Sequence, residues 1–146
     1  MKCRRIWGGM ALAAAALALA ATLSGCAAPD SGMMTSTHGR YAWALQMDNS
    51  NLDKALRVTA YKAGRKGKRI NASVTVVSHY STTLVLEARF VWVDADGAFL
   101  EGAGFVPWRT VTLKPGVPKT LKAKSSDSAA ANVRLQVRGG AKSWII

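Results

Sequence analysis

Alternating apolar and polar residues predict a series of short β-strands from residue 56 onward. Leu56, Val58 and Ala60 alternate with more polar neighbours along the first of these stretches. Successive side chains of a strand point to opposite faces of its sheet, so this period of two is typical of a strand with one buried face. Similar alternating or extended runs follow at residues 70–76, 108–113, 121–123 and 133–138.

The run over residues 84–93 predicts the longest strand, placed at the centre of a sheet. One of its faces is entirely apolar and ends in Phe90 and Trp92. The opposite face holds three valines together with Glu87 and Arg89. A strand that is partly apolar on both faces is expected to be covered on both sides, as central strands are.

Polar segments, several of which contain Gly, Pro or Asp, predict the turns between the strands. They occur at residues 62–69, 78–82, 94–97, 114–116 and 125–132. In the fourth of these, Pro115 presets φ and Gly116 permits a positive φ. No stretch after Asn51 shows a sustained apolar period of 3.6 residues. Six short strands separated by such turns predict an all-β fold, a small antiparallel immunoglobulin-like β-sandwich.

The first 26 residues have the layout of a lipoprotein export signal. Lys2, Arg4 and Arg5 precede an apolar run over residues 10–23, and the small residues 24 and 25 lead into Cys26. This order is that of a signal peptide, and the apolar run is too short to span a membrane. Residues 23–26 form a lipobox, which predicts cleavage after residue 25 and lipidation of Cys26.

The residue after the lipidated cysteine bears on the destination of the protein. Lipoproteins of Gram-negative bacteria with Asp at this position are retained at the inner membrane, and this chain has Ala27. By resemblance to that group we expect an outer-membrane protein, lipid-anchored and facing the periplasm. A lipoprotein cysteine carries more than one acyl chain, which makes such anchoring stable.

The expected domain organisation follows from these segments. We predict a signal peptide over residues 1–25, a lipid-anchored tether over 26–51, a sandwich domain over 52–138 and a tail over 139–146. Within the tether, residues 41–47 are more apolar and indicate either an extra strand or a patch that faces a partner.

The charge of the chain indicates contact with an anionic partner or a solvated surface. The chain has 20 Lys and Arg against 8 Asp and Glu. Lys2, Arg4 and Arg5 lie in the predicted signal, so the remainder carries 17 basic and 8 acidic residues, a net charge of +9. Candidate partners are envelope proteins, peptidoglycan and anionic lipid. Nucleic acid is excluded as a partner by the export signal.

Five basic residues without an acidic one between them form the most specific functional candidate: Lys62, Arg65, Lys66, Lys68 and Arg69. We expect them at an exposed turn between the first two core strands, because so many like charges are not buried without partners. Such a cluster binds either lipid phosphate or an acidic patch of a partner, or it is a solvated turn.

Residues that bear catalytic chemistry are few and scattered. His38 and His79 are the only histidines, and neither is clustered with the Cys, Asp or Glu that a metal site needs. Glu87 and Glu101 are not paired as general acid and base, and Glu87 is expected to be a cross-strand charge partner. No cysteine is left as a nucleophile once Cys26 is lipidated. We therefore expect no enzyme activity, no metal and no cofactor.

Two further motifs have structural interpretations. Asp94 and Asp96 with Gly97 resemble the start of a calcium loop, but the later oxygen ligands are missing, which favours a hairpin turn. Trp92 and Trp108 form either a binding platform or part of the core, and aromatic residues on long strands are more often core.

Three segments of the chain resemble a family of bacterial lipoproteins. Residues 86–97, with Phe90-Val91-Trp92-Val93-Asp94, are similar to an aromatic signature of the YcfL-like lipoproteins. Residues 108–116, from a Trp to a Pro-Gly turn, resemble the second motif of that family, and residues 132–137 its last strand. That family has no characterised function, so the resemblance implies a fold and a location, and no catalytic residues.

These features together predict a non-enzymatic envelope interaction module, anchored in the outer membrane. The alternative is a small β-sandwich lipoprotein of a type VI secretion membrane complex, which has the same size, anchor and fold class.

Overall fold

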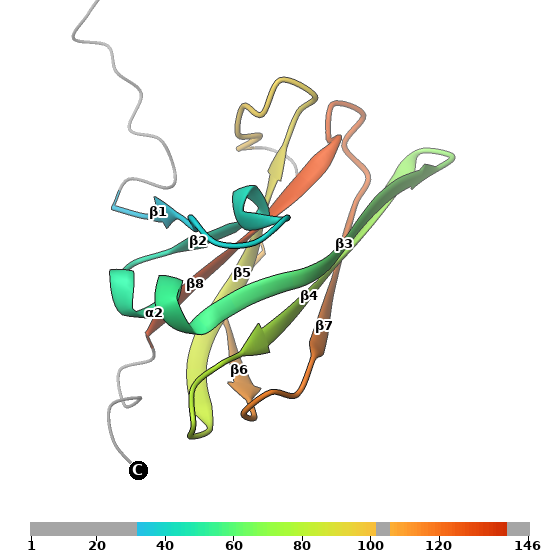
Figure 1. Ribbon diagram of the computed structural model, residues 1–146. Helices are drawn as coiled ribbons and strands as arrows, with labels where there is room; N and C mark the ends of the chain where they lie inside the picture. The colour runs from blue at the N-terminus through green and yellow to red at the C-terminus, as the bar shows by residue number, and fades with distance from the viewer. Residues whose placement is uncertain (1–31, 102–105, 140–146) are drawn as a thin grey trace, which may run out of the picture.

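Two facing β-sheets make up the part of the chain that the computed structural model describes, residues 32–101 and 106–139 (Figure 1). The elements in chain order are β1 (Met34–Thr35), the 3-10 helix η1 (Ala42–Ala44), β2 (Leu45–Met47), α2 (Ser50–Ala55), β3 (Leu56–Lys66), β4 (Arg69–Ser78), β5 (Leu84–Val93), β6 (Arg109–Leu113), β7 (Lys119–Ser125) and β8 (Asn132–Gly139).

One sheet has the strand order β1-β2-β8-β5-β6, and the other has the order β3-β4-β7. The all-β sandwich predicted from the sequence is therefore confirmed. β5 pairs with β8 on one side and with β6 on the other, so its predicted place inside a sheet is also confirmed. Pairing is antiparallel except between β2 and β8, which run parallel. The short strand β2 also confirms the expectation of an extra strand within residues 41–47.

The hydrophobic core fills the space between the sheets. β4 contributes alternate residues such as Ile70 and Val74, and β5 and β8 contribute Trp92 and Leu135 from the opposite sheet. The buried members of this core cluster extend from Leu45 to Val137. All of these core residues lie after residue 25, where the predicted signal peptide ends.

The hairpin of β3 and β4 is longer than the sequence predicted. β3 continues to Lys66 and β4 begins at Arg69, so only Gly67 and Lys68 form the turn. The prediction of a turn over the whole of residues 62–69 is wrong. The like charges do not prevent pairing, because long basic side chains at the end of a hairpin remain in solvent. Gly67 has a φ of 61°, which glycine adopts without strain.

A β-bulge in β3 changes which side chains face the core. The register shifts between Val58 and Ala60, so that Tyr61 instead of Ala60 continues the inward face. The sequence placed Ala60 on the buried face, and the structure exposes it. An extra residue in one strand reverses the alternation beyond it. Tyr61 then packs inward, and its hydroxyl accepts a hydrogen bond from the backbone N of Val133 at 3.0 Å, which ties the two sheets together.

The sandwich begins earlier in the chain than residue 52. β1, β2 and part of α2 lie in the range predicted as tether, and Leu45 and Met47 are fully buried. α2 is capped by the side chain of Asn49, which accepts a hydrogen bond from the backbone N of Leu52 at 3.1 Å. The sequence did not predict this helix, which at six residues is too short to show a helical period.

A buried carboxylate fastens the segment before β2 to this helix. Asp53 accepts hydrogen bonds from Ser36 Oγ at 2.8 Å, from the backbone N of Thr37 at 3.0 Å and from Thr37 Oγ1 at 2.7 Å. His38 Nδ1 lies 3.2 Å from the same carboxylate. Burial raises the pKa of Asp53, but the hydrogen bonds from Thr37 and Ser36 outweigh it and lower the pKa to about 2. His38, which lies in the range predicted as tether, is therefore part of a structural contact with α2.

Several predicted features lie outside the described residues. These are the signal peptide over residues 1–25, the lipidation site Cys26 and all of the predicted tail except Gly139. Within the described ranges, no helix is long and apolar enough to cross a membrane.

Candidate functional site

The outer face of the three-stranded sheet carries a continuous cationic surface. On β4, Ile70, Ala72, Val74 and Val76 point into the core, so Arg69 and Asn71 point outward with Ser73 and Thr75. Register then extends this face to both neighbours: Lys66 pairs with Arg69, and Lys62 and Lys122 both pair with Ser73. Lys124 joins them opposite Asn71. We call the outward residues Lys62, Lys66, Arg69, Lys122 and Lys124 the cationic face.

Acidic residues are absent from the three strands that form this face, since β3, β4 and β7 contain no Asp or Glu. All five basic side chains are exposed, and the residues between them, such as Gly64, Asn71 and Ser73, are uncharged. Neutral hydroxyls and amides among cations supply hydrogen-bond donors without competing charge. Chemically, the surface suits a flat or extended partner that carries several anionic groups.

The structure separates the five residues of the sequence cluster. Lys62, Lys66 and Arg69 belong to the cationic face, and Lys68 lies beside them in the exposed turn. Arg65 pairs with Ile70 and therefore points to the other side of the sheet. Lys122 and Lys124 were missed, because they lie far along the chain and only strand register brings them next to Lys62.

Arg65 contacts the loop between β7 and β8, whereas its predicted binding role stays a prediction. Its Nη2 donates hydrogen bonds to the carbonyl oxygens of Asp127 at 3.3 Å, Ser128 at 3.2 Å and Ala130 at 2.5 Å. These carbonyls belong to the loop between β7 and β8. A guanidinium with several donors in one plane is suited to bracing such a loop.

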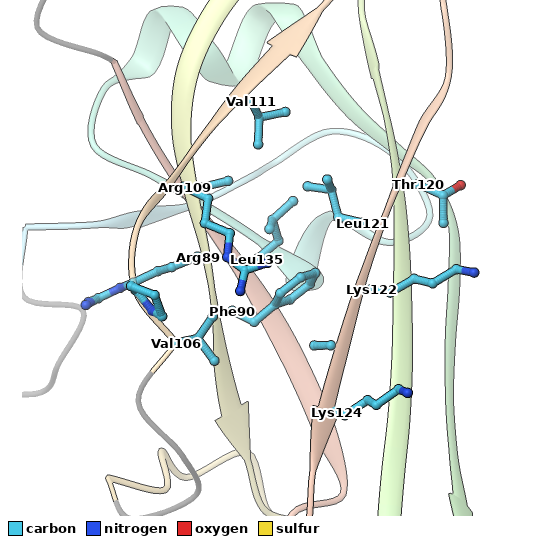
Figure 2. A pocket seen from close by; sticks show the side chains of 13 residues that line it. Arg89, Phe90, Val106, Arg109, Val111, Thr120, Leu121, Lys122, Lys124 and Leu135 are labelled. Carbon is cyan, nitrogen blue, oxygen red and sulfur yellow. The ribbon is translucent and has the colours of Figure 1, made fainter.

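A cavity of about 450 Å³ opens between the sheets, where β6 and β7 form their edges (Figure 2). Its inner wall is apolar, with Ala88, Phe90, Val111, Leu121, Ala123 and Leu135. Phe90 and Leu121 belong to the inward faces of their strands, yet both remain partly exposed, because none of the strands in the described ranges closes this side. Figure 2 shows Arg109 reaching from β6 toward Phe90, whereas Lys122 and Lys124 point away from the cavity.

A family model described as "Protein of unknown function (DUF1425)" matches residues 44–139, which include β2 to β8. The chain belongs to the DUF1425 family. Two crystal structures share the fold. The Campylobacter jejuni protein cj0090 has a TM-score of 0.55 at 20% identity, covering 66% of this chain and 98% of that one. A DUF1425 family member from Shewanella sp. pv-4 has a TM-score of 0.52 at 25% identity, covering 75% and 96%. No curated protein matches the chain.

The DUF1425 match covers both the cationic face and the cavity, but its description assigns no activity. Among the described residues, no three His, Cys, Asp or Glu side chains lie together in a way that would hold a metal ion. His79 is exposed in the turn after β4, and Glu101 is exposed in a turn as well. The sequence-derived candidates for metal or acid–base chemistry are therefore not assembled into one site in the described ranges.

Glu87 is a cross-strand charge partner, as predicted. It pairs with Arg138 of β8, and the distance from Arg138 Nε to Glu87 Oε2 is 2.6 Å. Arg138 also lies over the ring of Trp108, with its Cζ 4.2 Å from the ring centroid. Arg89 Cζ lies 4.6 Å from the same centroid, and Arg89 Nε donates to Gln136 Oε1 at 2.8 Å. Burial and the neighbouring positive charge of Arg138 lower the pKa of Arg89.

Trp92 and Trp108, the two candidates for a binding platform, do not lie together in this member of the DUF1425 family. Trp92 is 2% exposed and faces the core, which confirms the core interpretation for this residue. Trp108 precedes β6 and is held by the stacked guanidinium groups of Arg89 and Arg138. Asp94 closes the hairpin turn that was predicted in place of a calcium loop, since its Oδ1 accepts from the backbone N of Asp96 and of Ala98, each at 2.9 Å.

Replacing Arg65 with alanine is expected to loosen the loop between β7 and β8. Three carbonyl groups lose their charged donor, and we expect a loss of about 1–2 kcal/mol in the free energy of unfolding. Amide hydrogen exchange of residues 127–131 should become faster. Lys68→Ala, in the same hairpin but in its exposed turn, serves as the control and should leave exchange unchanged. Equal exchange in both variants would contradict the bracing role.

Proposed function

We propose that this protein is a non-enzymatic, lipid-anchored module of the cell envelope whose cationic face binds an anionic membrane surface. The lipobox ending at Cys26 supports the anchor, and Ala27 supports an outer-membrane location facing the periplasm. Membership of the DUF1425 family agrees with the resemblance to YcfL-like lipoproteins, for which the same location is expected. The single observation that carries the proposal is the acid-free cationic face.

Strand pairing gives this face its binding capacity. Neighbouring strands of a sheet lie about 4.8 Å apart, so Lys62 and Lys122 each lie about one strand spacing from Ser73, on its two sides. Several exposed cations on one plane add their attraction to anionic lipid, at about 1 kcal/mol per Lys or Arg near the surface. A sheet face is also flatter than a loop, so all of its cations approach a planar surface together.

The test uses residues 26–146 with Cys26 replaced by Ser, so that no acyl anchor masks the surface. Binding to vesicles that contain phosphatidylglycerol is measured by sedimentation. Lys122→Ser/Lys124→Ser is expected to weaken binding about tenfold or more, because two cations leave the face. Lys66→Ser/Lys68→Ser/Arg69→Ser should weaken it further. Thermal stability should change by less than about 0.5 kcal/mol in each variant, since the substituted side chains are exposed.

The matched control is Lys54→Ser/Lys114→Ser, which removes the same charge from exposed positions outside the cationic face. Its binding should stay close to that of the parent. Binding of the parent should also weaken with salt, because the screening length falls from about 10 Å at 0.1 M to about 3 Å at 1 M. An equal loss in the control would show that net charge alone acts. Vesicle binding that does not change with salt would exclude an electrostatic role of the cationic face. Binding to isolated peptidoglycan but not to vesicles would show that peptidoglycan, and not the membrane, is the partner.

A further inference from the structure

The cavity between β6 and β7 combines an apolar wall with one inward cation. Arg109 pairs with Ala88 across the sheet, and Ala88 is buried on the inner face, so Arg109 also lies on the side of the core. Its side chain reaches into the cavity toward Phe90 (Figure 2). Within the described ranges, no carboxylate pairs with Arg109. Arg109 itself is exposed, so its guanidinium stands at the mouth of the apolar space, where it can pair with the anionic group of a ligand.

The other basic residues that line the cavity do not compete for this role. Lys122 and Lys124 belong to the outward face of β7 and point away from the cavity (Figure 2). Arg89 is also directed away from it, where it stacks on Trp108 and donates to Gln136. Arg109 is therefore the cation that a molecule inside the cavity would meet.

The edges of the cavity are unsuited to an added β-strand. Lys119 Nζ donates to the carbonyl oxygen of Thr112 on β6 at 3.3 Å, which occupies an acceptor of that strand. Pro107 lies just before β6, and β7 carries three lysines within seven residues. Edge lysines and prolines are devices that oppose strand pairing. At about 450 Å³ the cavity instead lies in the range of small-molecule sites, roughly 300–1,000 Å³.

The wall determines the chemistry of the inserted part of a ligand. Ala88, Phe90, Val111, Leu121, Ala123 and Leu135 offer no side-chain hydrogen-bond donor or acceptor. A polar group inserted between them would lose its water without compensation, so only hydrocarbon is suited to this space. The anionic group lies at the mouth of the cavity, because Arg109 lines the cavity and is itself exposed. A guanidinium and a carboxylate form paired hydrogen bonds in one plane.

We propose that this cavity binds a single acyl chain with a carboxylate head, a fatty-acid anion, whose head group pairs with Arg109. The hydrocarbon lies along Phe90, Leu121 and Leu135. This site is separate from the cationic face, since it faces the space between the sheets and uses a different basic residue.

The probe is dodecanoate, measured by isothermal titration calorimetry against residues 26–146 with Cys26→Ser, prepared without detergent. One molecule is expected to bind per chain. Arg109→Gln should weaken its affinity about tenfold or more, the usual effect of removing a charged hydrogen bond. Lys122→Gln is the control, because Lys122 has the same charge and lines the same cavity but its side chain points away from it. The dodecanoate affinity of this variant should stay within about twofold of that of the parent. Circular dichroism checks that both variants fold.

Three comparisons decide the assignment. Dodecanol lacks the anion, so it should bind the parent more weakly than dodecanoate does. The affinity of dodecanol for the Arg109→Gln variant should equal its affinity for the parent. Absence of dodecanoate binding, or equal losses in both variants, would overturn the proposal. Tighter binding of dodecyl phosphate than of dodecanoate would overturn the carboxylate head group in favour of a phospholipid-type ligand. The cationic-face variants are expected to lose vesicle binding and to keep the dodecanoate affinity of the parent. The two proposals can therefore be contradicted separately.

Discussion

Replacing Trp92 with alanine is expected to lower the free energy of unfolding by about 3–5 kcal/mol, the usual cost of deleting a large buried aromatic side chain. Trp92 lies on the inward face of β5 with 2% of its surface exposed. Trp92 is the largest fully buried side chain in the described ranges, so its removal deletes the most buried volume there. The loss is a large part of the total stability of a small domain, about 5–15 kcal/mol. Urea unfolding followed by circular dichroism measures it.

Trp92→Phe is expected to cost clearly less, for a reason specific to this site. The indole Nε1 is buried and has no hydrogen-bond partner in the part of the chain that the structure describes. Phenylalanine loses some packing but also removes this unpaired donor, whose burial is itself unfavourable. Trp43→Ala is the control, because Trp43 is 41% exposed. A loss at Trp43 as large as that at Trp92 would contradict the core assignment.

The second large effect is expected at Asp53. Asp53→Ala removes the acceptor of Ser36 and Thr37 and leaves their donors partly buried, so we expect a loss of about 1.5–3 kcal/mol at pH 7. Urea unfolding of the variant and of the parent gives this difference. Asp53→Asn keeps one acceptor oxygen and is expected to lose less. Lys54→Ala, at the next and exposed position of α2, should have little effect.

The same carboxylate predicts how stability depends on pH. The pKa of Asp53 is lowered from 3.8 to about 2 in the folded protein. Stability from the ionised group is therefore fully present above the unfolded pKa, and it is lost as pH falls from about 4 toward 2. A shift of this size corresponds to about 2 kcal/mol. The parent should lose this amount in urea unfolding between pH 5 and pH 2, and the Asp53→Ala variant should lack that component. Parallel pH curves for both proteins would exclude the linkage.

Features that depend on local alternation were predictable from the sequence. β5 alternates over ten residues, which correctly predicted both its central position and the pairing of Glu87 with a charge on the neighbouring strand. The turns at Asp94 and Pro115 were also found, because Asp, Pro and Gly define turn geometry within a few residues. Each of these inferences uses only neighbours in the chain.

Features that depend on register were not predictable in the same way. The bulge after Val58 reverses which residues of β3 face outward, so Lys62 and Lys66 lie on the outer face and Arg65 on the inner one. The sequence shows five similar charges, and nothing in their spacing reveals the bulge. The cationic face includes Lys122 and Lys124 only because β7 pairs with β4 in one particular register. The role of Asp53 was missed because its partners precede it by about 16 residues across a loop.

The parallel pairing of β2 with β8 has a consequence for the order of folding. Gln46 and Gln136 lie side by side and 90 residues apart in the chain, and Gln136 Nε2 donates to Gln46 Oε1 at 3.0 Å in a buried position. Closing so large a loop is entropically costly, and domains dominated by such distant contacts fold slowly. During synthesis, the segment around Leu45 cannot pair with β8 until β8 has emerged from the ribosome. Until then its apolar residues remain accessible to chaperones, so the N-terminal strands are expected to be the last part of the sandwich to gain protection.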